Sequence, residues 1–162
     1  MPSALSRSFL LFLVCSLVIV FDQVSKFLIR HFMTPGESIP AEGLFRITYT
    51  TNTGGAFGLF ANHTFLLAAI AVIGIIIFAV YLKSIPLHLG WLKVGLGLSL
   101  GGAIGNLVDR LRIGEVTDFI DLGFWPVFNL ADSAIVVGTI VIAYYLIFLA
   151  GRTPNRPPQP DE

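Results

Sequence analysis

Two aspartates in the second half of the chain have surroundings that favour acid–base chemistry. Asp118 lies in the segment VTDFID (residues 116–121), and Asp132 lies in FNLADS (residues 128–133), so each carboxyl has apolar neighbours. Two carboxyls that lie close together cannot both ionise easily, so they share a proton and titrate as a pair. The ionised member can deprotonate water while the protonated member polarises a carbonyl group. The two residues therefore predict an aspartic peptidase.

Some of the reactive residues also fit roles outside an aspartic peptidase. Asp132 alone is equally typical of an acid in the first turn of a helix, which the helix dipole favours. The segment GLSLG (residues 97–101) matches the serine-nucleophile pattern G-x-S-x-G, but the strand–turn–helix context is absent, and His31, His63 and His88 all lie at the ends of apolar segments. A structural role for Ser99 is therefore favoured. The chain has no H-E-x-x-H motif, which excludes a zincin, and no metal site is predicted.

A second group of charges lies inside the first apolar segment. Asp22 and Lys26 are four residues apart, acid first, which places them on one face of a helix as an ion pair. A charge inside a bilayer costs about 3 kcal/mol on insertion scales, so the pair requires a reason to be there. Two interpretations stay open: a pair that neutralises itself near the membrane interface, or a pair at the rim of a site.

The third apolar segment combines small and polar residues. Gly97, Gly101 and Gly105 recur at every fourth position and predict a stripe that a neighbouring helix approaches closely. An adjoining face, at helical spacing, carries a second set of residues: Gly102, Asn106, Asp109 and Arg110. We interpret this second set as a hydrogen-bonding cluster beside a polar cavity, with interfacial capping of the helix as the alternative.

The amino-acid composition indicates whether these polar residues belong to a soluble or a membrane protein. The chain has 162 residues, of which 55% are hydrophobic and only 12% charged, and its mean hydropathy is +0.83. Soluble domains carry about 25% charged residues, so an integral membrane protein of one domain is predicted. The formal net charge of zero argues against a nucleic-acid partner, and the single cysteine, Cys15, excludes an internal disulfide.

Four apolar segments are long enough to be membrane helices, at about residues 9–30, 64–82, 91–110 and 131–150. They form one predicted domain over residues 1–150, followed by a disordered tail at 151–162. The first segment is interpreted as a retained anchor because no small-x-small cleavage site follows it. Basic residues divide equally between the two sides of the membrane, whereas eight of the ten acidic residues lie on the side of the long loops. That side is therefore expected to carry the chemistry.

The first long loop contains a strand-like segment at residues 44–51, which is rich in β-branched and aromatic residues, followed by a predicted turn at residues 52–55. A small sheet lying on the membrane surface and an ordinary exterior hairpin both fit this pattern.

Taken in order, five segments make the chain resemble the bacterial lipoprotein signal peptidases (signal peptidase II): DQVSK (22–26), NTGGAF (52–57), GGAIGNLVDR (101–110), VTDF (116–119) and FNLADS (128–133). Each motif is short, but five in order across residues 22–133 form a specific signal. One departure is visible, since Gly55 stands where the family usually has alanine.

The resemblance implies an all-α integral membrane protein with four transmembrane helices and a small β-rich platform outside the membrane. It implies an intramembrane aspartyl endopeptidase that removes signal peptides from prolipoproteins, cutting before the diacylglyceryl-modified cysteine. The residue roles that it implies are a catalytic dyad of Asp118 and Asp132, positioning of the substrate or dyad by Asn52, Asn106, Arg110 and Asn129, and support by Asp22, Lys26 and Asp109.

It further implies that no metal or cofactor is needed. The expected location is the bacterial inner membrane, with both termini cytoplasmic and the active site towards the outer face. Lipid-modified prolipoproteins and membrane lipids are the expected partners, and the protein is expected to be a monomer.

Two functions of different classes compete with the peptidase. The first is a proton-coupled carrier that uses Asp22, Asp109 and Asp132 as relay groups, although the four segments show no repeated half of the kind that carriers often have. The second is a membrane scaffold that assembles through the glycine stripe, which leaves the polar residues without a role.

Overall fold

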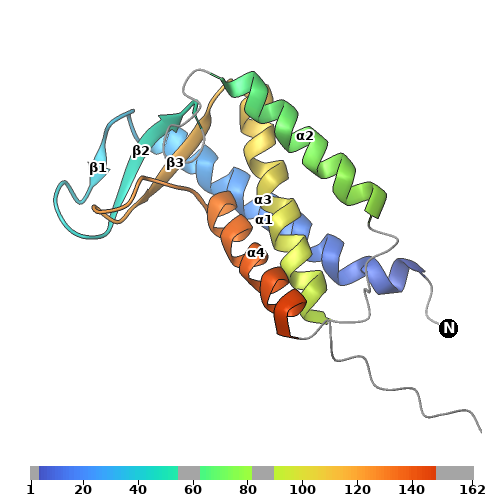
Figure 1. Cartoon of the computed structure of the whole chain (residues 1–162). Helices are drawn as coiled ribbons and strands as arrows, with labels where there is room; N and C mark the ends of the chain where they lie inside the picture. Colours follow the sequence, from blue (N-terminus) through green and yellow to red (C-terminus); the bar gives the residue numbers. More distant parts are fainter. Residues whose placement is uncertain (1–3, 55–62, 82–89, 149–162) are drawn as a thin grey trace, which may run out of the picture.

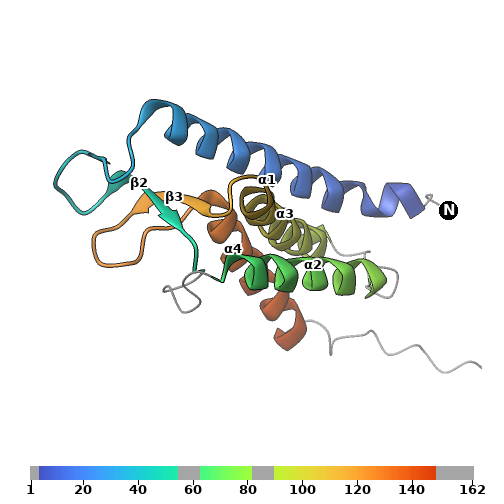
Figure 2. The same cartoon turned by 90° about the horizontal axis from the view of Figure 1, so that it is seen from above.

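The computed structural model describes residues 4–54, 63–81 and 90–148, and the statements below concern those residues. Helices dominate, and a small sheet lies at one end of them (Figures 1 and 2). The elements in chain order are α1 (Ala4–Phe32), β1 (Ser38–Ile39), β2 (Arg46–Asn52), α2 (Thr64–Tyr81), α3 (Gly90–Arg112), β3 (Val116–Asp121) and α4 (Leu130–Phe148). The predicted tail at 151–162 lies outside the described residues.

Helix α3 is the centre of the bundle, because α1, α2 and α4 all pack against it (Figure 1). The predicted glycine stripe is confirmed as the surface that receives α1. A Cβ atom added at Gly97 would lie 2.7 Å from the carbonyl oxygen of Leu11, and one added at Gly101 would lie 2.8 Å from that of Cys15. Since backbone atoms cannot move aside, only glycine permits this approach of the two helices.

Gly102, which we interpreted as part of the hydrogen-bonding cluster, is instead explained by helix packing. A Cβ atom at this position would collide with the carbonyl oxygen of Ala131 in the first turn of α4. Gly102 therefore lets the start of α4 lie directly against α3. This contact positions Asp132, which lies in the same turn.

The outer faces of the helices are apolar, as lipid contact requires. Three helices are long and apolar enough to cross a membrane: Ser8–Phe32 within α1, Gly90–Arg112 and Leu130–Phe148. Their exposed side chains include Phe9 and Ile147, which would be costly to leave in water. These helices correspond to the predicted spans at 9–30, 91–110 and 131–150, although residues 149–150 lie outside the described part.

The predicted span at 64–82 forms a helix that is shorter than expected. The apolar part of α2 covers Thr64–Val80, which is less than the about 20 residues that usually span a bilayer. Within the described residues, three helices rather than four thus meet the length and composition of a membrane span.

The sheet has the order β1-β2-β3, and both pairs of neighbours are antiparallel. The strand predicted at residues 44–51 is found as β2, and Asn52, which was predicted to begin a turn, is its last residue. Asp118 lies in β3, a strand that was not predicted, and pairs with Thr50. Strand β3 escaped prediction because five of its six residues are buried, so it lacks the polar alternation of a strand with one exposed face.

Candidate active site

The two predicted catalytic aspartates come from different elements. Asp118 lies in β3 and is only 1% exposed, while Asp132 lies in the first turn of α4 and is half-buried. Strand β3 contacts the ends of α1 and α3, and α4 begins beside it (Figure 1). The sheet and the bundle therefore each supply one carboxyl to the same junction.

One residue, Asn129, contacts both carboxyls. Its Nδ2 donates to Asp118 Oδ1 over 2.6 Å, and its backbone N–H donates to Asp132 Oδ2 over 3.3 Å. The Asn129 Oδ1 in turn accepts a hydrogen bond from the backbone N–H of Asp132 over 2.9 Å. Asn129 is thus the N-cap of α4, and Asp132 completes a reciprocal capping arrangement. The interpretation of Asp132 as a helix-start acid is correct in part, but the same turn also brings it to Asp118.

Two further asparagines donate to the remaining carboxylate oxygens. Asn52, at the end of β2, donates through Nδ2 to Asp118 Oδ2 over 2.9 Å. Asn106, on α3, donates through Nδ2 to Asp132 Oδ1 over 2.8 Å. The Asn129 Nδ2 also reaches Asn106 Oδ1 at 3.2 Å, which closes the network. Every carboxylate oxygen of the pair therefore accepts a hydrogen bond from an asparagine.

Behind the pair lies a fully buried ion cluster. Lys26 Nζ is 3.0 Å from Asp22 Oδ2, 3.3 Å from Asp109 Oδ2 and 2.9 Å from Asn106 Oδ1. Asp22 and Lys26 are both 0% exposed, and Lys26 also contacts Asp109 and Asn106, so the pair does more than neutralise itself. Asp22 Oδ1 also accepts from the backbone N–H of Ala131 over 3.0 Å, which joins α1 to the first turn of α4. The cluster thus lies in the interior, in contact with the site.

The sequence analysis assigned no role to three residues of this region: Gln23, Arg30 and Thr117. Gln23 Nε2 donates to Asp22 Oδ2 and Asp109 Oδ1 and to the carbonyl oxygen of Gly105, at 3.1 to 3.2 Å. Arg30 Nη1 donates to Thr117 Oγ1 over 2.8 Å and lies 3.5 Å from Asp109. Arg30 follows Lys26 by four residues, as Lys26 follows Asp22, so this spacing was a signal that could have found it.

The predicted binding residue Arg110 lies at the edge of the network. It is half-buried, and its Nη1 reaches the carbonyl oxygen of Asn106 at 3.5 Å, while its Nε has no hydrogen-bond partner among the described residues. Its charge acts on Asp118 and Asp132. Most of its donors are therefore not committed to the described part of the protein.

Burial dominates the titration of Asp118. Loss of solvent, together with the neighbouring Asp132 charge, raises the pKa of this carboxyl to about 6, against the lowering effect of the hydrogen bonds from Asn52 and Asn129 and of the Lys26 charge. The carboxyl can therefore hold a proton in weakly acidic surroundings. Within the described residues, no cluster of three or more histidine, cysteine or acidic side chains could hold a metal ion.

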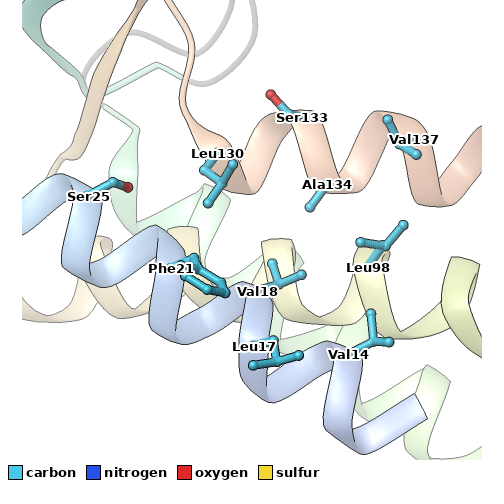
Figure 3. A pocket seen from close by; sticks show the side chains of 10 residues that line it. All are labelled: Val14, Leu17, Val18, Phe21, Ser25, Leu98, Leu130, Ser133, Ala134 and Val137. Atoms are coloured by element: carbon cyan, nitrogen blue, oxygen red, sulfur yellow. The ribbon is translucent and has the colours of Figure 1, made fainter. Parts of the chain in front are cut away.

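Two apolar cavities lie along α4, and only the smaller reaches a catalytic candidate. The larger, about 630 Å³, lies between α1 and α4, where Phe21, Val18 and Val14 face Ala134 and Val137 (Figure 3). It contains neither aspartate, so we do not assign the chemistry to it. The smaller, about 510 Å³, is lined by Asp132 and the following set: Leu122, Phe124, Trp125, Phe128, Ser133, Val136 and Val137.

Comparison with known proteins shows the family of this chain. The model of the family described as Signal peptidase (SPase) II matches residues 14–148, a range that contains the whole network. The chain belongs to the signal peptidase II family. A relative named lipoprotein signal peptidase, from Moorella thermoacetica, is 48% identical over 90% of this chain and 97% of its own length. One of the same name from Pelotomaculum thermopropionicum is 45% identical over 85% and 91%.

Two solved structures of membrane enzymes are similar to this chain. One described as a bacterial membrane enzyme superposes with a TM-score of 0.82 at 30% identity, covering 92% of this chain and 94% of that one. A second with the same description has a TM-score of 0.76 at 33% identity. The signal peptidase II resemblance predicted from the five motifs is therefore confirmed, and the chain is a multi-pass membrane peptidase.

Of the nine site residues expected from the signal peptidase II resemblance, eight form one continuous set of hydrogen bonds and ion pairs. Arg110 joins the set only through its long contact with Asn106. The residues of the set come from five elements, α1, β2, α3, β3 and α4, together with the residue before α4. Asp22 also accepts the hydrogen bond from the Ala131 N–H, which lies 109 residues further along the chain.

Proposed function

We propose that this protein is an intramembrane aspartyl endopeptidase that removes signal peptides from prolipoproteins, cutting before the diacylglyceryl-modified cysteine. Membership of the signal peptidase II family carries the substrate class. The observation that carries the aspartic mechanism is the bridge formed by Asn129, which hydrogen-bonds to Asp118 and to Asp132. Two carboxyls that share one donor residue lie near enough to act on a common substrate.

In the proposed reaction, Asp132 is the ionised base and Asp118 holds the proton. Asp132 takes a proton from water, and the resulting hydroxide attacks the carbonyl carbon of the scissile peptide bond. The Asp118 proton polarises the carbonyl oxygen. The proton that Asp132 took from water then passes to the leaving nitrogen as the tetrahedral intermediate collapses. The raised pKa of Asp118 supports this division of roles.

The surroundings of Asp132 favour a lipidated substrate. The cavity of about 510 Å³ that includes Asp132 is otherwise lined mainly by aromatic and aliphatic side chains, among them Phe124, Trp125 and Val136. An apolar substituent next to the scissile bond would be in contact with this lining, whereas a polar one would lose hydration there. Arg110 supplies uncommitted donors for carbonyl oxygens of the substrate backbone.

The proposed setting is the bacterial inner membrane, with α2 as a fourth span, both termini cytoplasmic and the sheet at the outer face. The arrangement supports this, because the sheet, the end of α1 and the start of α4 lie at the same end of the bundle (Figure 1). Water can then reach the dyad without crossing the bilayer. A monomer suffices, since all the proposed groups come from one chain.

The experiment that tests the function uses Asp118→Asn and Asp132→Asn in the purified enzyme. We expect each to slow cleavage of a diacylglyceryl-modified precursor by about 10²- to 10⁴-fold. Product formation is measured by mass spectrometry, which also locates the cut relative to the modified cysteine. Asp121→Asn is the matched control, because this acid lies on the same strand but pairs with Arg46, and it should remain active. Undiminished turnover in either dyad variant would remove the assignment.

A further inference from the structure

The side-chain amide of Asn106 stands between the ion cluster and the catalytic pair. Its Oδ1 accepts from Lys26 Nζ at 2.9 Å and from Asn129 Nδ2 at 3.2 Å, while its Nδ2 donates to Asp132 at 2.8 Å. An amide has an acceptor at one end and donors at the other, so half a turn exchanges them. A turned Asn106 would place its oxygen against the Asp132 carboxylate, where two acceptors repel each other.

The observed orientation follows from groups that can only donate. The Lys26 ammonium has three hydrogens and no acceptor, so the end of Asn106 that faces it must be the oxygen. The backbone N–H of Asp132 likewise fixes Asn129 Oδ1 as an acceptor, which turns the Asn129 Nδ2 towards Asn106. Two donors therefore hold the Asn106 amide, and the ammonium is both the nearer and the charged one.

All three hydrogens of the Lys26 ammonium already have acceptors within the protein. Its Nζ lies within 3.3 Å of one oxygen each of Asp22, Asp109 and Asn106, which accounts for its three hydrogens, and its side chain is 0% exposed. It therefore has neither the free electron pair nor the access to substrate that a nucleophile or base requires.

We propose that Lys26 is a positioning residue of the hydrolysis, which keeps the Asn106 amide turned so that it donates to Asp132 and favours the ionised form of that base. This inference rests on the proposed function and adds to it the reason for a buried cation behind the dyad. Asp22 and Asp109 then serve to hold the ammonium, and Lys26 acts on Asp132 only through Asn106.

Further charges near the dyad could in principle produce the same effect. They come from the two helices packed against it: Asp22 and Arg30 from α1, with Asp109 and Arg110 from α3. Arg110 reaches only the backbone carbonyl of Asn106, at 3.5 Å, and Arg30 is bonded to Thr117. Neither arginine contacts the amide, so Lys26 is the cation that fixes it.

Lys26→Met tests the proposal through the pH dependence of cleavage. Methionine has similar length but donates no hydrogen bond. We expect kcat to fall by about 10- to 100-fold and KM for the lipidated precursor to change little, because Lys26 does not touch substrate. The profile of kcat against pH should move to higher pH by about one unit, because Asp132 then ionises against an acceptor and Asp118 loses a nearby positive charge. An unmoved profile in the folded variant would overturn the proposal.

A double-mutant cycle with Asn106→Ala separates positioning from a general structural effect. If Lys26 acts through Asn106, adding Lys26→Met to Asn106→Ala should slow cleavage by no more than about twofold beyond Asn106→Ala alone. If the cleavage rate of the double variant falls by the product of the two single-variant losses, the proposal is contradicted, since independent effects multiply.

Two further variants guard against loss of folding. Lys26→Met leaves two buried acids without their cation, so Lys26→Met combined with Asp22→Asn, which removes one of the charges, is measured beside it and should show the same displaced pH profile. Arg30→Met is the matched control: it also removes a cation from Asp109 but has no contact with Asn106, so its pH profile should match that of the parent. Inactive dyad variants together with a parental profile for Lys26→Met would refute the positioning role alone, whereas active dyad variants would refute the proposed function itself.

Discussion

Two sets of paired charges occupy different surroundings in this protein. Asp22, Lys26 and Asp109 form a cluster inside the helix bundle, with side chains that are at most 1% exposed. Arg46 and Asp121 form a pair on the sheet, with Nη2 and Oδ2 only 2.7 Å apart, but the arginine is 27% exposed. The shorter ion pair is thus the one that water reaches.

The difference shows that separation alone does not determine what an ion pair contributes. Solvent screens the sheet pair, and Asp121 has other donors, so little depends on Arg46. The bundle cluster has no solvent to replace a lost partner, and it joins α1, α3 and the first turn of α4. Removal of one charged member of the cluster leaves the others with an uncompensated charge behind the dyad. The comparison therefore predicts large effects in the bundle and small ones on the sheet.

The largest effect is expected for Asp22→Ala. The substitution removes the nearest carboxylate of Lys26 and the acceptor for the Ala131 N–H. The free energy of unfolding should fall by about 3–5 kcal/mol, because a buried ammonium then keeps only Asp109 as its ionic partner. Chemical denaturation in detergent micelles, followed by circular dichroism, measures this loss.

Asp22→Asn is the matched control for that substitution. It keeps an oxygen for the Ala131 N–H while removing the charge, so its loss of stability should be smaller than that of Asp22→Ala. If Asp22→Ala were no more damaging than a substitution of Arg46, the contrast between the two sets of charges would be refuted.

An intermediate effect is expected from two acids of the same strand. Burial raises the pKa of Asp118 to about 6, whereas hydrogen bonds, first that from the Gly123 N–H, lower the pKa of Asp121. The stability that a raised pKa contributes is complete below pH 3.8 and is lost as pH rises through about 6. For Asp121 the sign is opposite, and its contribution is lost as pH falls.

The measurement compares Asp118→Asn and Asp121→Asn with the parent between pH 4 and pH 8. Relative to the parent, Asp118→Asn should gain about 2–3 kcal/mol of unfolding free energy as pH rises across this range. Asp121→Asn should change little relative to the parent over the same rise, because the contribution of Asp121 is complete above pH 3.8 and is lost only below it. A gain for Asp121→Asn as large as that for Asp118→Asn would show that the two acids do not differ in surroundings as described.

Sequence analysis identified the bundle charges because a charged residue inside an apolar segment costs free energy and therefore stands out in the chain. Asp22 and Lys26 interrupt an apolar segment, and the spacing of four residues already predicts their contact. The glycine stripe predicted the close approach of a helix for the same local reason. The five motifs supplied the family and the proposed roles of Asp118 and Asp132.

What the sequence did not reveal depends on contacts distant in the chain. Strand β3, which carries Asp118, was not predicted because it is buried on nearly all sides, and burial removes the alternation by which strands are recognised. The role of Gly102 depends on Ala131, and the importance of Asn129 depends on its reaching both β3 and α4. No local pattern reports that a cap residue also bridges two acids.

The smallest effect is expected for Arg46→Met. After this substitution Asp121 Oδ2 still accepts from Thr48 Oγ1 at 2.8 Å, and Oδ1 still accepts from the Gly123 N–H at 2.8 Å. The carboxylate therefore keeps a donor on each oxygen, and the free energy of unfolding should fall by only about 0–1 kcal/mol. Cleavage of the lipidated precursor should be unchanged, because no contact within the described residues joins Arg46 to the dyad network.

A rise in salt concentration should lower the free energy of unfolding of the parent towards that of Arg46→Met, since salt screens an exposed ion pair but hardly reaches the buried cluster. A loss as large as that of Asp22→Ala would mean that the sheet, rather than the bundle interior, holds the site together.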